Sequence, residues 1–273
     1  MNEKIKLVCV DLDGTLLKND KTISEKTISA AKQAAERGIE IVPVTGRPLS
    51  GLPQAVKRLP GVHCAVTSNG ACITELCSGR KIYSAPLPNR KSVEIMHLLN
   101  EKGCLYEAFA DDVGYIESAL MEKYRQKFTG TPVGDYIFGS RKLVPDICAL
   151  FESEKKCADE IFINLPCEED RNLLASYLSS DSSLDFCLLE KNFLEVLNCG
   201  TNKGRALGFL CSYFNVKKEN TAAFGDNEND LPLLEAAGMS VAMGNASEKV
   251  KNLAKAVTET NENDGVAVLL AQF

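Results

Sequence analysis

The strongest pattern along the chain is an apolar run over residues 5–10, interrupted only by Lys6, which is typical of a strand buried on both faces. The run ends at Asp11, and Asp13 follows two positions later. Because side chains two apart on an extended chain point the same way, both carboxylates can share one pocket. Gly14 then allows a sharp turn. Taken alone, the Asp-Gly pair is also an ordinary turn signal. Whether the two carboxylates form a site therefore depends on what the rest of the chain contains.

A helix and a second strand follow this run. Residues 24–37 carry apolar side chains at helical spacing, with Ser24 as the expected N-cap and Gly38 just beyond the end. The β-branched run over residues 39–44 predicts a strand, in which Pro43 favours a position where the ladder is already ending. This strand-helix-strand order is a βαβ unit, which predicts parallel strands joined by a right-handed crossover.

The chain alternates in the same way towards its other end, and the region between differs. Short apolar runs predict further strands and helices, the strands at residues 62–67, 193–197, 221–224 and 240–243 and the helices from Lys203 and over residues 231–237 and 247–254. The middle region mixes helical patterns with short strands, predicted at Ala149–Glu152 and Glu160–Asn164. We therefore expect an α/β, Rossmann-like parallel-sheet core from residues 1–83 and 199–273, with an α+β domain inserted at residues 84–198.

Composition excludes several classes of partner. The chain has 273 residues, 45% of them hydrophobic, and a net charge of −6. Without a basic stripe, neither nucleic acid nor an anionic membrane surface is expected as the main partner. No apolar run approaches the roughly 20 residues of a membrane span, and the first residues lack a signal-peptide pattern. The eleven cysteines are scattered with no CxxC pair, which favours reduced, mostly buried thiols in a cytoplasmic protein over zinc ligands or disulfides.

Four polar elements stand at the ends of the predicted strands or the start of a helix: Asp11 with Asp13, Thr45 with Gly46, Lys203, and the segment 225–230, which contains Asp226, Asn229 and Asp230. In a doubly wound parallel sheet such points converge along one edge. Carboxylates, a hydroxyl, backbone N–H groups and one ammonium suit Mg²⁺ and a phosphoryl group. A calcium loop starting at Asp11 or at Asp226 is excluded, since neither has Gly at its sixth position or Glu at its twelfth, and no Walker A loop occurs.

These elements resemble the four ordered motifs of the haloacid dehalogenase (HAD) superfamily, namely DLDGT from Asp11, TGR from Thr45, the lysine of NKG at Lys203, and GDNEND from Gly225. The long insertion between the second and third motifs is similar to the large cap (C2 type) of the Cof-type branch, HAD-IIB. The resemblance of the core covers both ends of the chain, whereas the insertion matches only in size and position.

The resemblance implies a role for each matching residue. Asp11 is expected to be the nucleophile that forms an aspartyl-phosphate, and Asp13 the general acid and then base. Magnesium is expected at Asp11, the backbone carbonyl of Asp13 and Asp226, with Asp230 in support. The phosphoryl oxygens are expected to bind the residues Thr45, Gly46 and Lys203, with Asn229 orienting phosphate or lysine and Arg47 reaching the substrate.

The expected function is a Mg²⁺-dependent phosphatase of small soluble phosphomonoesters, such as sugar phosphates, nucleotides or phosphorylated cofactors. Two alternatives stay open from the sequence, a sugar phosphomutase with the same nucleophile and a phospho-ligand binding protein without turnover. The first would yield an isomerised sugar phosphate with little free phosphate. The physiological substrate, the cap residues that select it and the oligomeric state are not indicated.

Overall fold

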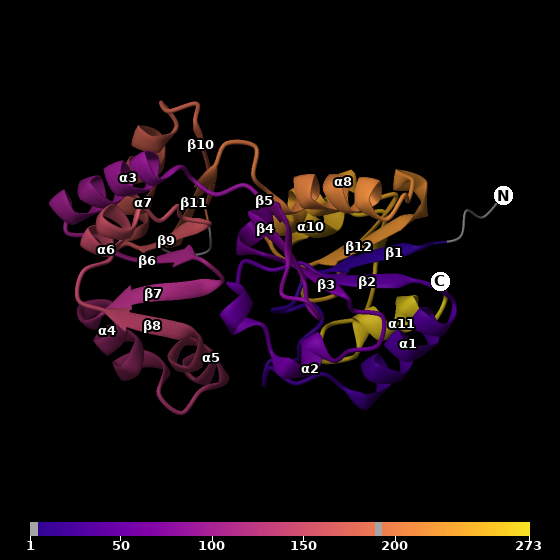
Figure 1. Cartoon of the computed structure of the whole chain (residues 1–273). Helices are drawn as coiled ribbons and strands as arrows, with labels where there is room; N and C mark the ends of the chain where they lie inside the picture. The colour runs from indigo at the N-terminus through magenta and orange to yellow at the C-terminus, as the bar shows by residue number, and fades with distance from the viewer. Residues whose placement is uncertain (1–4, 189–192) are drawn as a thin grey trace. The chain divides into compact units, whose positions relative to one another are not determined.

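The computed structural model describes residues 5–188 and 193–273, so residues 1–4 and 189–192 of the predicted domains lie outside the described part. The chain forms two compact units, shown in Figure 1. The first unit contains the chain up to Gly46, Leu52–Tyr83 and Asn202–Phe273, and the second contains Arg47–Gly51 and Ser84–Thr201.

The first unit is built on a five-stranded sheet with the order β14-β13-β12-β1-β2, in which every neighbouring pair is parallel. The strand β1, which lies between β12 and β2, is the apolar run before Asp11, and all four of its residues are buried. Figure 1 shows α8 on one side of this sheet and α1 and α11 on the other. The strands are β1 (Leu7–Val10), β2 (Glu40–Pro43), β12 (Thr221–Gly225), β13 (Met239–Ala242) and β14 (Ala256–Val257).

The helices predicted over residues 24–37, 231–237 and 247–254 and the helix predicted from Lys203 are all present in this unit. The hydroxyl of Ser24 accepts a hydrogen bond from the Thr27 N–H and caps the first helix, and Gly38 lies just beyond its end with φ +79°. The helices are α1 (Glu25–Glu36), α2 (Gln54–Lys57), α8 (Lys203–Tyr213), α9 (Leu231–Ala236), α10 (Glu248–Leu253) and α11 (Gly265–Leu270), with 3₁₀ turns at Ser68–Gly70, Lys218–Asn220 and Glu228–Asp230. The predicted Rossmann-like core is therefore confirmed.

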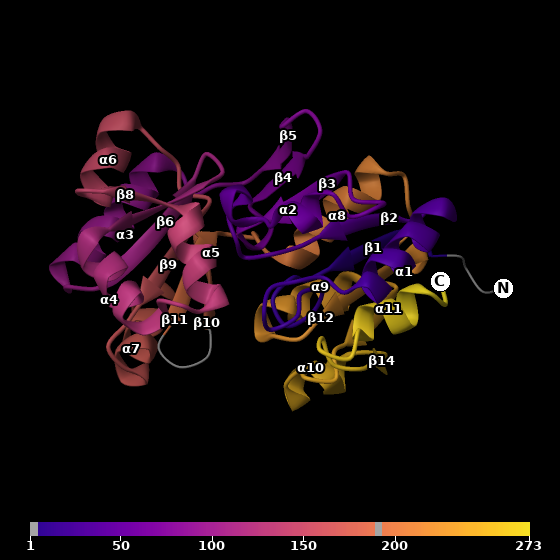
Figure 2. The same cartoon turned by 90° about the horizontal axis from the view of Figure 1, so that it is seen from below.

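The predicted strand at residues 62–67 is present as β3 (Cys64–Thr67) but belongs to a separate three-stranded sheet with β4 (Cys72–Glu75) and β5 (Lys81–Ser84). It pairs antiparallel with β4, and Figure 2 shows the β4–β5 hairpin extending beyond β3. A single parallel bridge, Val44 to Val66, links it to the end of β2.

The second unit is an α+β structure on a six-stranded sheet of order β10-β11-β9-β6-β7-β8, antiparallel except for the pair β7–β8. Helices α3, α6 and α7 pack on one face of the sheet and α4 and α5 on the other. The elements are α3 (Asn89–Glu101), β6 (Leu105–Ala110), β7 (Val113–Glu117), α4 (Ser118–Phe128), α5 (Pro132–Ser140), β8 (Arg141–Val144), α6 (Ile147–Glu154), β9 (Glu160–Asn164), α7 (Glu168–Leu178), β10 (Leu184–Leu188) and β11 (Phe193–Asn198).

Two expectations for the chain are wrong. Ala149–Glu152, predicted as a strand, lies within helix α6, because the Asp146 carboxylate accepts from the Ala149 N–H and caps a helix whose Ile147 and Phe151 are buried. The cysteines are not mostly buried: all eleven are free, but only Cys9, Cys64, Cys72 and Cys148 are buried, and the others are exposed or half-buried. Within the described residues, no helix has the length and apolar character needed to cross a membrane.

Candidate active site

The candidate site begins where three neighbouring strands end. Strand β1 lies between β12 and β2, with Val10 in register with Phe224 on one side and Pro43 on the other. Asp11 continues from β1, and its N–H donates to the Phe224 carbonyl at 3.1 Å. Asp226 and Thr45 follow the two flanking strands. The parallel sheet thus brings three predicted site residues to one edge, as open α/β sheets do.

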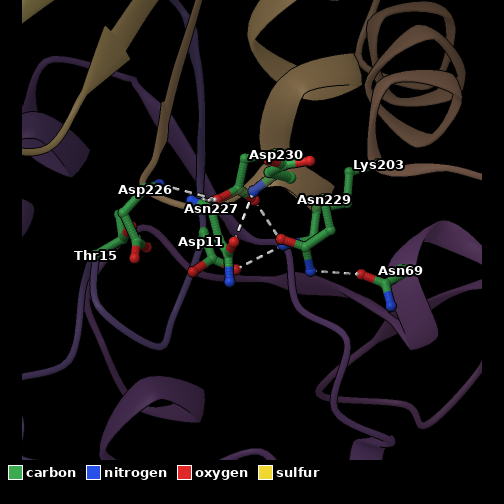
Figure 3. Close-up of polar contacts among 9 residues, drawn as sticks. Asp11, Thr15, Asn69, Lys203, Asp226, Asn227, Asn229 and Asp230 are labelled. Carbon is green, nitrogen blue, oxygen red and sulfur yellow. Dashed lines mark hydrogen bonds and ion pairs between the residues drawn. The ribbon is translucent and has the colours of Figure 1, made fainter. Parts of the chain in front are cut away.

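Lys203 joins this edge from the first turn of α8. Its side chain is 1% exposed, and its Nζ lies 2.7 Å from Oδ1 of Asp11 and 2.6 Å from Oδ1 of Asp230, as Figure 3 shows. The Asn202 side chain caps α8 by accepting from the Arg205 N–H at 2.9 Å, which fixes the backbone that presents the lysine. One buried ammonium therefore bridges two carboxylates that are far apart in the sequence.

The two aspartates after β12 are held in different ways. Asp230 is fully buried, and its Oδ2 accepts from the N–H groups of Asp226 at 2.9 Å and Asn227 at 3.0 Å. Asp226 accepts from the Thr15 hydroxyl at 2.7 Å. Gly14 lies close by with φ +83°, and a Cβ there would stand 2.4 Å from Asp226 Oδ2. Only glycine fits this turn, since it supplies both the conformation and the space.

The cluster carries more negative than positive charge. Asp11, Asp226 and Asp230 offer carboxylate oxygens that all lie within 4.8 Å of one another, and among the described residues they form the only such group of three or more potential metal ligands. In the described part of the chain, the cation that pairs with this group is Lys203, through Asp11 and Asp230. An all-oxygen donor set of carboxylates is what Mg²⁺ prefers, so these residues fit a divalent cation by their chemistry.

The pKa values of these groups reflect the same excess of negative charge. Burial, and then the neighbouring charge of Asp230, raise the pKa of Asp11 well above its usual range. The same two causes raise the pKa of Asp226 to about 6. Burial by itself would lower the pKa of Lys203, but the charges of Asp11 and Asp230 outweigh it and raise that pKa. The lysine is therefore an ammonium throughout the physiological range.

Asp13 lies apart from this group. Its side chain is 41% exposed, and its Oδ1 lies 2.6 Å from Nζ of Lys21. Its carboxylate is not one of the three that converge. The ion pair with Lys21 was not expected from the sequence, where Lys21 is one polar residue of a loop.

The segment after β2 is hydrogen-bonded to Asn69, a residue that the sequence analysis did not single out. Asn69 receives a hydrogen bond at 3.1 Å from the amide of Asn229, and its N–H donates to the Thr45 carbonyl at 3.0 Å. A Cβ on Gly46 would stand 3.0 Å from the Asn69 amide nitrogen. The sequence signal was the Asn-Gly pair directly after a strand, which permits the left-handed φ of +50° found at Asn69.

Arg47 packs within the second unit. Its guanidinium lies 3.9 Å from the centre of the Tyr136 ring and donates to the Gly51 carbonyl at 3.0 Å, and the residue is 5% exposed. Ser50 adds hydrogen bonds to the carbonyls of Asp112 and Ser140. The five residues after Gly46 are therefore attached to the second unit by their contacts, although they follow the Thr45–Gly46 turn in the sequence.

With this geometry in place, comparison with known proteins identifies the class. The family model of haloacid dehalogenase-like hydrolases matches residues 8–270. The chain belongs to this family, and the resemblance seen in the four motifs is confirmed.

Individual relatives match along their whole lengths. The chain is 33% identical to the 5-amino-6-(5-phospho-D-ribitylamino)uracil phosphatase YitU of Bacillus subtilis, over 100% of this chain and 99% of that protein. A solved haloacid dehalogenase-like hydrolase of B. subtilis superposes with a TM-score of 0.86 at 28% identity, covering 97% of this chain and 99% of the other. The HAD subclass IIB sugar phosphatase BT4131 shares the fold with a TM-score of 0.79 at 23% identity, covering 98% of each chain.

Proposed function

We propose that this hydrolase is a Mg²⁺-dependent phosphatase that cleaves phosphomonoesters of small metabolites through a phosphorylated Asp11. The observation that carries the proposal is the buried cluster at the carboxyl end of β1, in which Lys203 contacts Asp11 and Asp230 while Asp226 converges with them. Phosphoryl transfer requires chiefly positioning and charge stabilisation, and this cluster supplies both.

Asp11 is the proposed nucleophile. One of its carboxylate oxygens attacks the phosphorus, the ester P–O bond breaks, and the leaving oxygen takes a proton from Asp13. Water then attacks the same phosphorus and gives its proton to Asp13, which releases phosphate and restores Asp11. Lys203 supports this assignment because its ammonium, 2.7 Å from Asp11, is placed to offset the charge of the phosphoryl oxygens.

Magnesium fits the remaining acidic groups. The proposed ligands are the Asp11 carboxylate, the Asp13 backbone carbonyl and Asp226. Both Asp230 oxygens are already engaged, one by Lys203 and one by two backbone N–H groups, so Asp230 is assigned to bracing the site. When bound, the cation would neutralise the carboxylates and polarise the phosphoryl group.

The phosphoryl group is proposed to meet Thr45, the Gly46 N–H and Lys203, with Asn229 held by Asn69 at the same end of the sheet. We assign residues 84–198, the bulk of the second unit, to a cap that selects the leaving group, and Arg47 to substrate binding through that unit. The relative YitU is named for a substrate with a phosphorylated ribityl chain, which makes phosphorylated polyols and sugars the first substrates to test. Eleven free thiols support a reducing, cytoplasmic compartment.

The test is phosphate release from a panel of phosphorylated sugars, polyols, nucleotides and cofactors, with Mg²⁺ or with EDTA. Asp11→Asn keeps the shape of the side chain and removes the nucleophile, so we expect a loss of at least about 10³-fold with a melting curve like that of wild type. Asp135→Asn, at an exposed helix position outside the site, is the matched control. Full turnover by Asp11→Asn would contradict the covalent route, and an isomerised sugar phosphate without free phosphate would indicate a mutase.

A further inference from the structure

The turn Ser68–Gly70, between β3 and β4, has a backbone that the proposed function does not explain. Its three residues have φ values of +47°, +50° and +103°, the longest run of left-handed residues in the described chain. Ser68 and Asn69 carry side chains, for which this conformation is unfavourable, and all three residues are buried. Strained residues persist only where their surroundings hold them, and they are common at functional sites. The strain therefore points to a role for this turn.

The turn holds the Thr45–Gly46 segment through the backbone. The Asn69 N–H donates to the Thr45 carbonyl at 3.0 Å, and the Thr45 N–H donates to the Val66 carbonyl of β3 at 3.0 Å. Gly46 then passes so close to Asn69 that a Cβ on it would lie 3.0 Å from Nδ2 of the asparagine. Both backbone polar groups of Thr45 and the path of Gly46 are thus fixed by β3 and this turn.

The Asn69 side chain reaches the segment after β12. Its Oδ1 accepts from Nδ2 of Asn229 at 3.1 Å, as Figure 3 shows, and Asn69 is 3% exposed. Asn229 belongs to the 3₁₀ turn that ends at Asp230, the residue whose carboxylate contacts Lys203 at 2.6 Å. Because an amide has distinct donor and acceptor ends, the bond to Asn69 fixes the orientation of the Asn229 side chain.

The turn also touches the start of α8. A Cβ on Gly70 would lie 2.4 Å from the carbonyl oxygen of Asn202, the N-cap residue of α8, and 3.2 Å from the backbone nitrogen of Lys203. Glycine is therefore needed here for its space as well as for its φ of +103°. The turn thus contacts three segments that are far apart in the sequence and carry the proposed phosphate-binding groups Thr45, Asn229 and Lys203.

We propose that Asn69 is a positioning residue that sets the distance between the Thr45–Gly46 segment and Asn229, and thereby the shape of the phosphoryl-binding site. This inference rests on the proposed function, in which both segments bind or orient the phosphoryl oxygens. They follow β2 and β12, which are not neighbours in the sheet because β1 lies between them. Asn69 links them, with its N–H on one segment and its side chain on the other.

The decisive substitution is Asn69→Gly, because glycine keeps the left-handed backbone and removes the amide that reaches Asn229. A loosened site binds substrate and phosphate less well. We therefore expect KM and the inhibition constant of inorganic phosphate to rise about tenfold, with a smaller change in kcat. Asn215→Gly is the matched control, the same substitution at φ +51° in an exposed position after α8, and it should change neither constant.

A double-mutant cycle tests whether Asn69 acts through Asn229. Asn229→Ala should raise the same two constants, and adding Asn69→Gly to it should raise them by less than about twofold more. A role confined to folding would lower the melting temperature without changing the phosphate constant of the folded protein. Full multiplication of the two effects, or an unchanged phosphate constant in Asn69→Gly, would overturn the inference.

Calorimetric titration of the protein with inorganic phosphate, in the presence of Mg²⁺, separates this inference from the proposed function. If wild type releases phosphate from no substrate, the proposed function fails, but weaker phosphate binding by Asn69→Gly than by Asn215→Gly still supports the positioning role. Equal phosphate affinity in these two variants, or no phosphate binding by wild type, would overturn the positioning role. Turnover by wild type would leave the phosphatase assignment intact in that case.

Discussion

Each unit of the molecule buries an ion-paired cation, but the two surroundings differ in charge. In the first unit, Lys203 faces Asp11 and Asp230 with Asp226 nearby, so three carboxylates surround one ammonium. In the second unit, Arg141 pairs one to one with Glu107, and the two side chains are 5% and 2% exposed.

In the second unit, the Arg141 guanidinium is surrounded by hydrogen-bond acceptors and aromatic rings. Besides Glu107, the Arg141 guanidinium donates to the Tyr136 hydroxyl at 2.9 Å and to Oγ of Ser140 at 2.8 Å. Its Cζ lies 4.8 Å from the centres of the Tyr136 and Phe109 rings. Burial lowers the pKa of Arg141, but the charge of Glu107 outweighs it and raises the pKa overall.

The comparison shows that burial and ion pairing do not by themselves define a reactive site. The cluster in the second unit is balanced, so no further charge is needed to make it stable. With all three carboxylates ionised, the cluster in the first unit has an excess of two negative charges even with Lys203 ionised, which is the condition for recruiting a cation and then an anionic substrate.

The largest effect is expected from Lys203→Met. It leaves the buried carboxylates of Asp11 and Asp230 without their ammonium, which should lower the free energy of unfolding by about 3 kcal/mol and reduce phosphate release by at least about 10³-fold. Because the defect is an excess of negative charge, saturating Mg²⁺ should restore part of the stability but not the activity. Thermal melts with and without Mg²⁺ measure this, and a melting temperature insensitive to Mg²⁺ in both proteins would count against the cation site.

Arg141→Met should destabilise by a similar amount, about 3 kcal/mol, because it leaves the Glu107 carboxylate buried and unpaired. Here Mg²⁺ should restore nothing, since no group of converging carboxylates is created. The double variant Arg141→Met with Glu107→Leu removes the charge as well and should recover most of the lost stability in denaturant titrations. Recovery of the single variant by Mg²⁺ would abolish the distinction between the two clusters.

Without a cation, rising pH should weaken the first cluster. The pKa of Asp226 is raised to about 6, so the native state holds the proton more tightly than the unfolded chain does. Its contribution is present below the ordinary pKa near 4 and is lost as pH rises through 6, which amounts to a change on the order of 3 kcal/mol. Asp11 acts in the same direction, while Lys203 stays charged across this range.

The check is the free energy of unfolding in EDTA from about pH 4.5 to about pH 7, an interval that brackets the titration of Asp226. The variant Asp226→Asn is measured under the same conditions for comparison. The wild type should lose stability relative to the variant as pH rises, and Mg²⁺ should cancel that loss. A wild-type stability that rises relative to Asp226→Asn across this window would show that the cluster is not short of positive charge.

The smallest effect is expected from Tyr136→Phe. It removes the hydroxyl that accepts from Arg141 but keeps the ring that Arg47 and Arg141 contact, so the loss should be about 1 kcal/mol. Tyr136→Leu removes the ring as well and should cost more. Equal losses in the two variants would mean that the ring faces contribute little to holding the Arg47 segment.

The sequence was sufficient to predict the first cluster because its members follow regular elements. Asp11 and Asp226 each come directly after a buried strand, and Lys203 is the first residue of a helix, so the rules of parallel sheets bring them to one edge. No rule of that kind predicts Glu107 with Arg141. They come from strands β6 and β8, which are not neighbours in the sheet and have β7 between them.

Contacts made by turns were missed for a related reason. Asn69 beside Asn229 and Lys21 beside Asp13 depend on left-handed residues whose side-chain directions no periodic pattern specifies. The error at Ala149–Glu152 is of another type, because a short apolar run fits a strand and a buried helix equally well. The capping Asp146 just before it was the signal that would have favoured the helix.

The most direct test of the account is a search for the phosphate on Asp11 itself. Wild-type protein turning over p-nitrophenyl phosphate with Mg²⁺ would be quenched in acid within the first turnovers, and the peptide spanning Asp11 weighed by mass spectrometry. The account predicts one added phosphoryl group on that peptide, present during turnover, absent once substrate is exhausted and never seen in Asp11→Asn. Turnover with an unmodified Asp11 peptide, together with undiminished activity of Asp11→Asn, would contradict it.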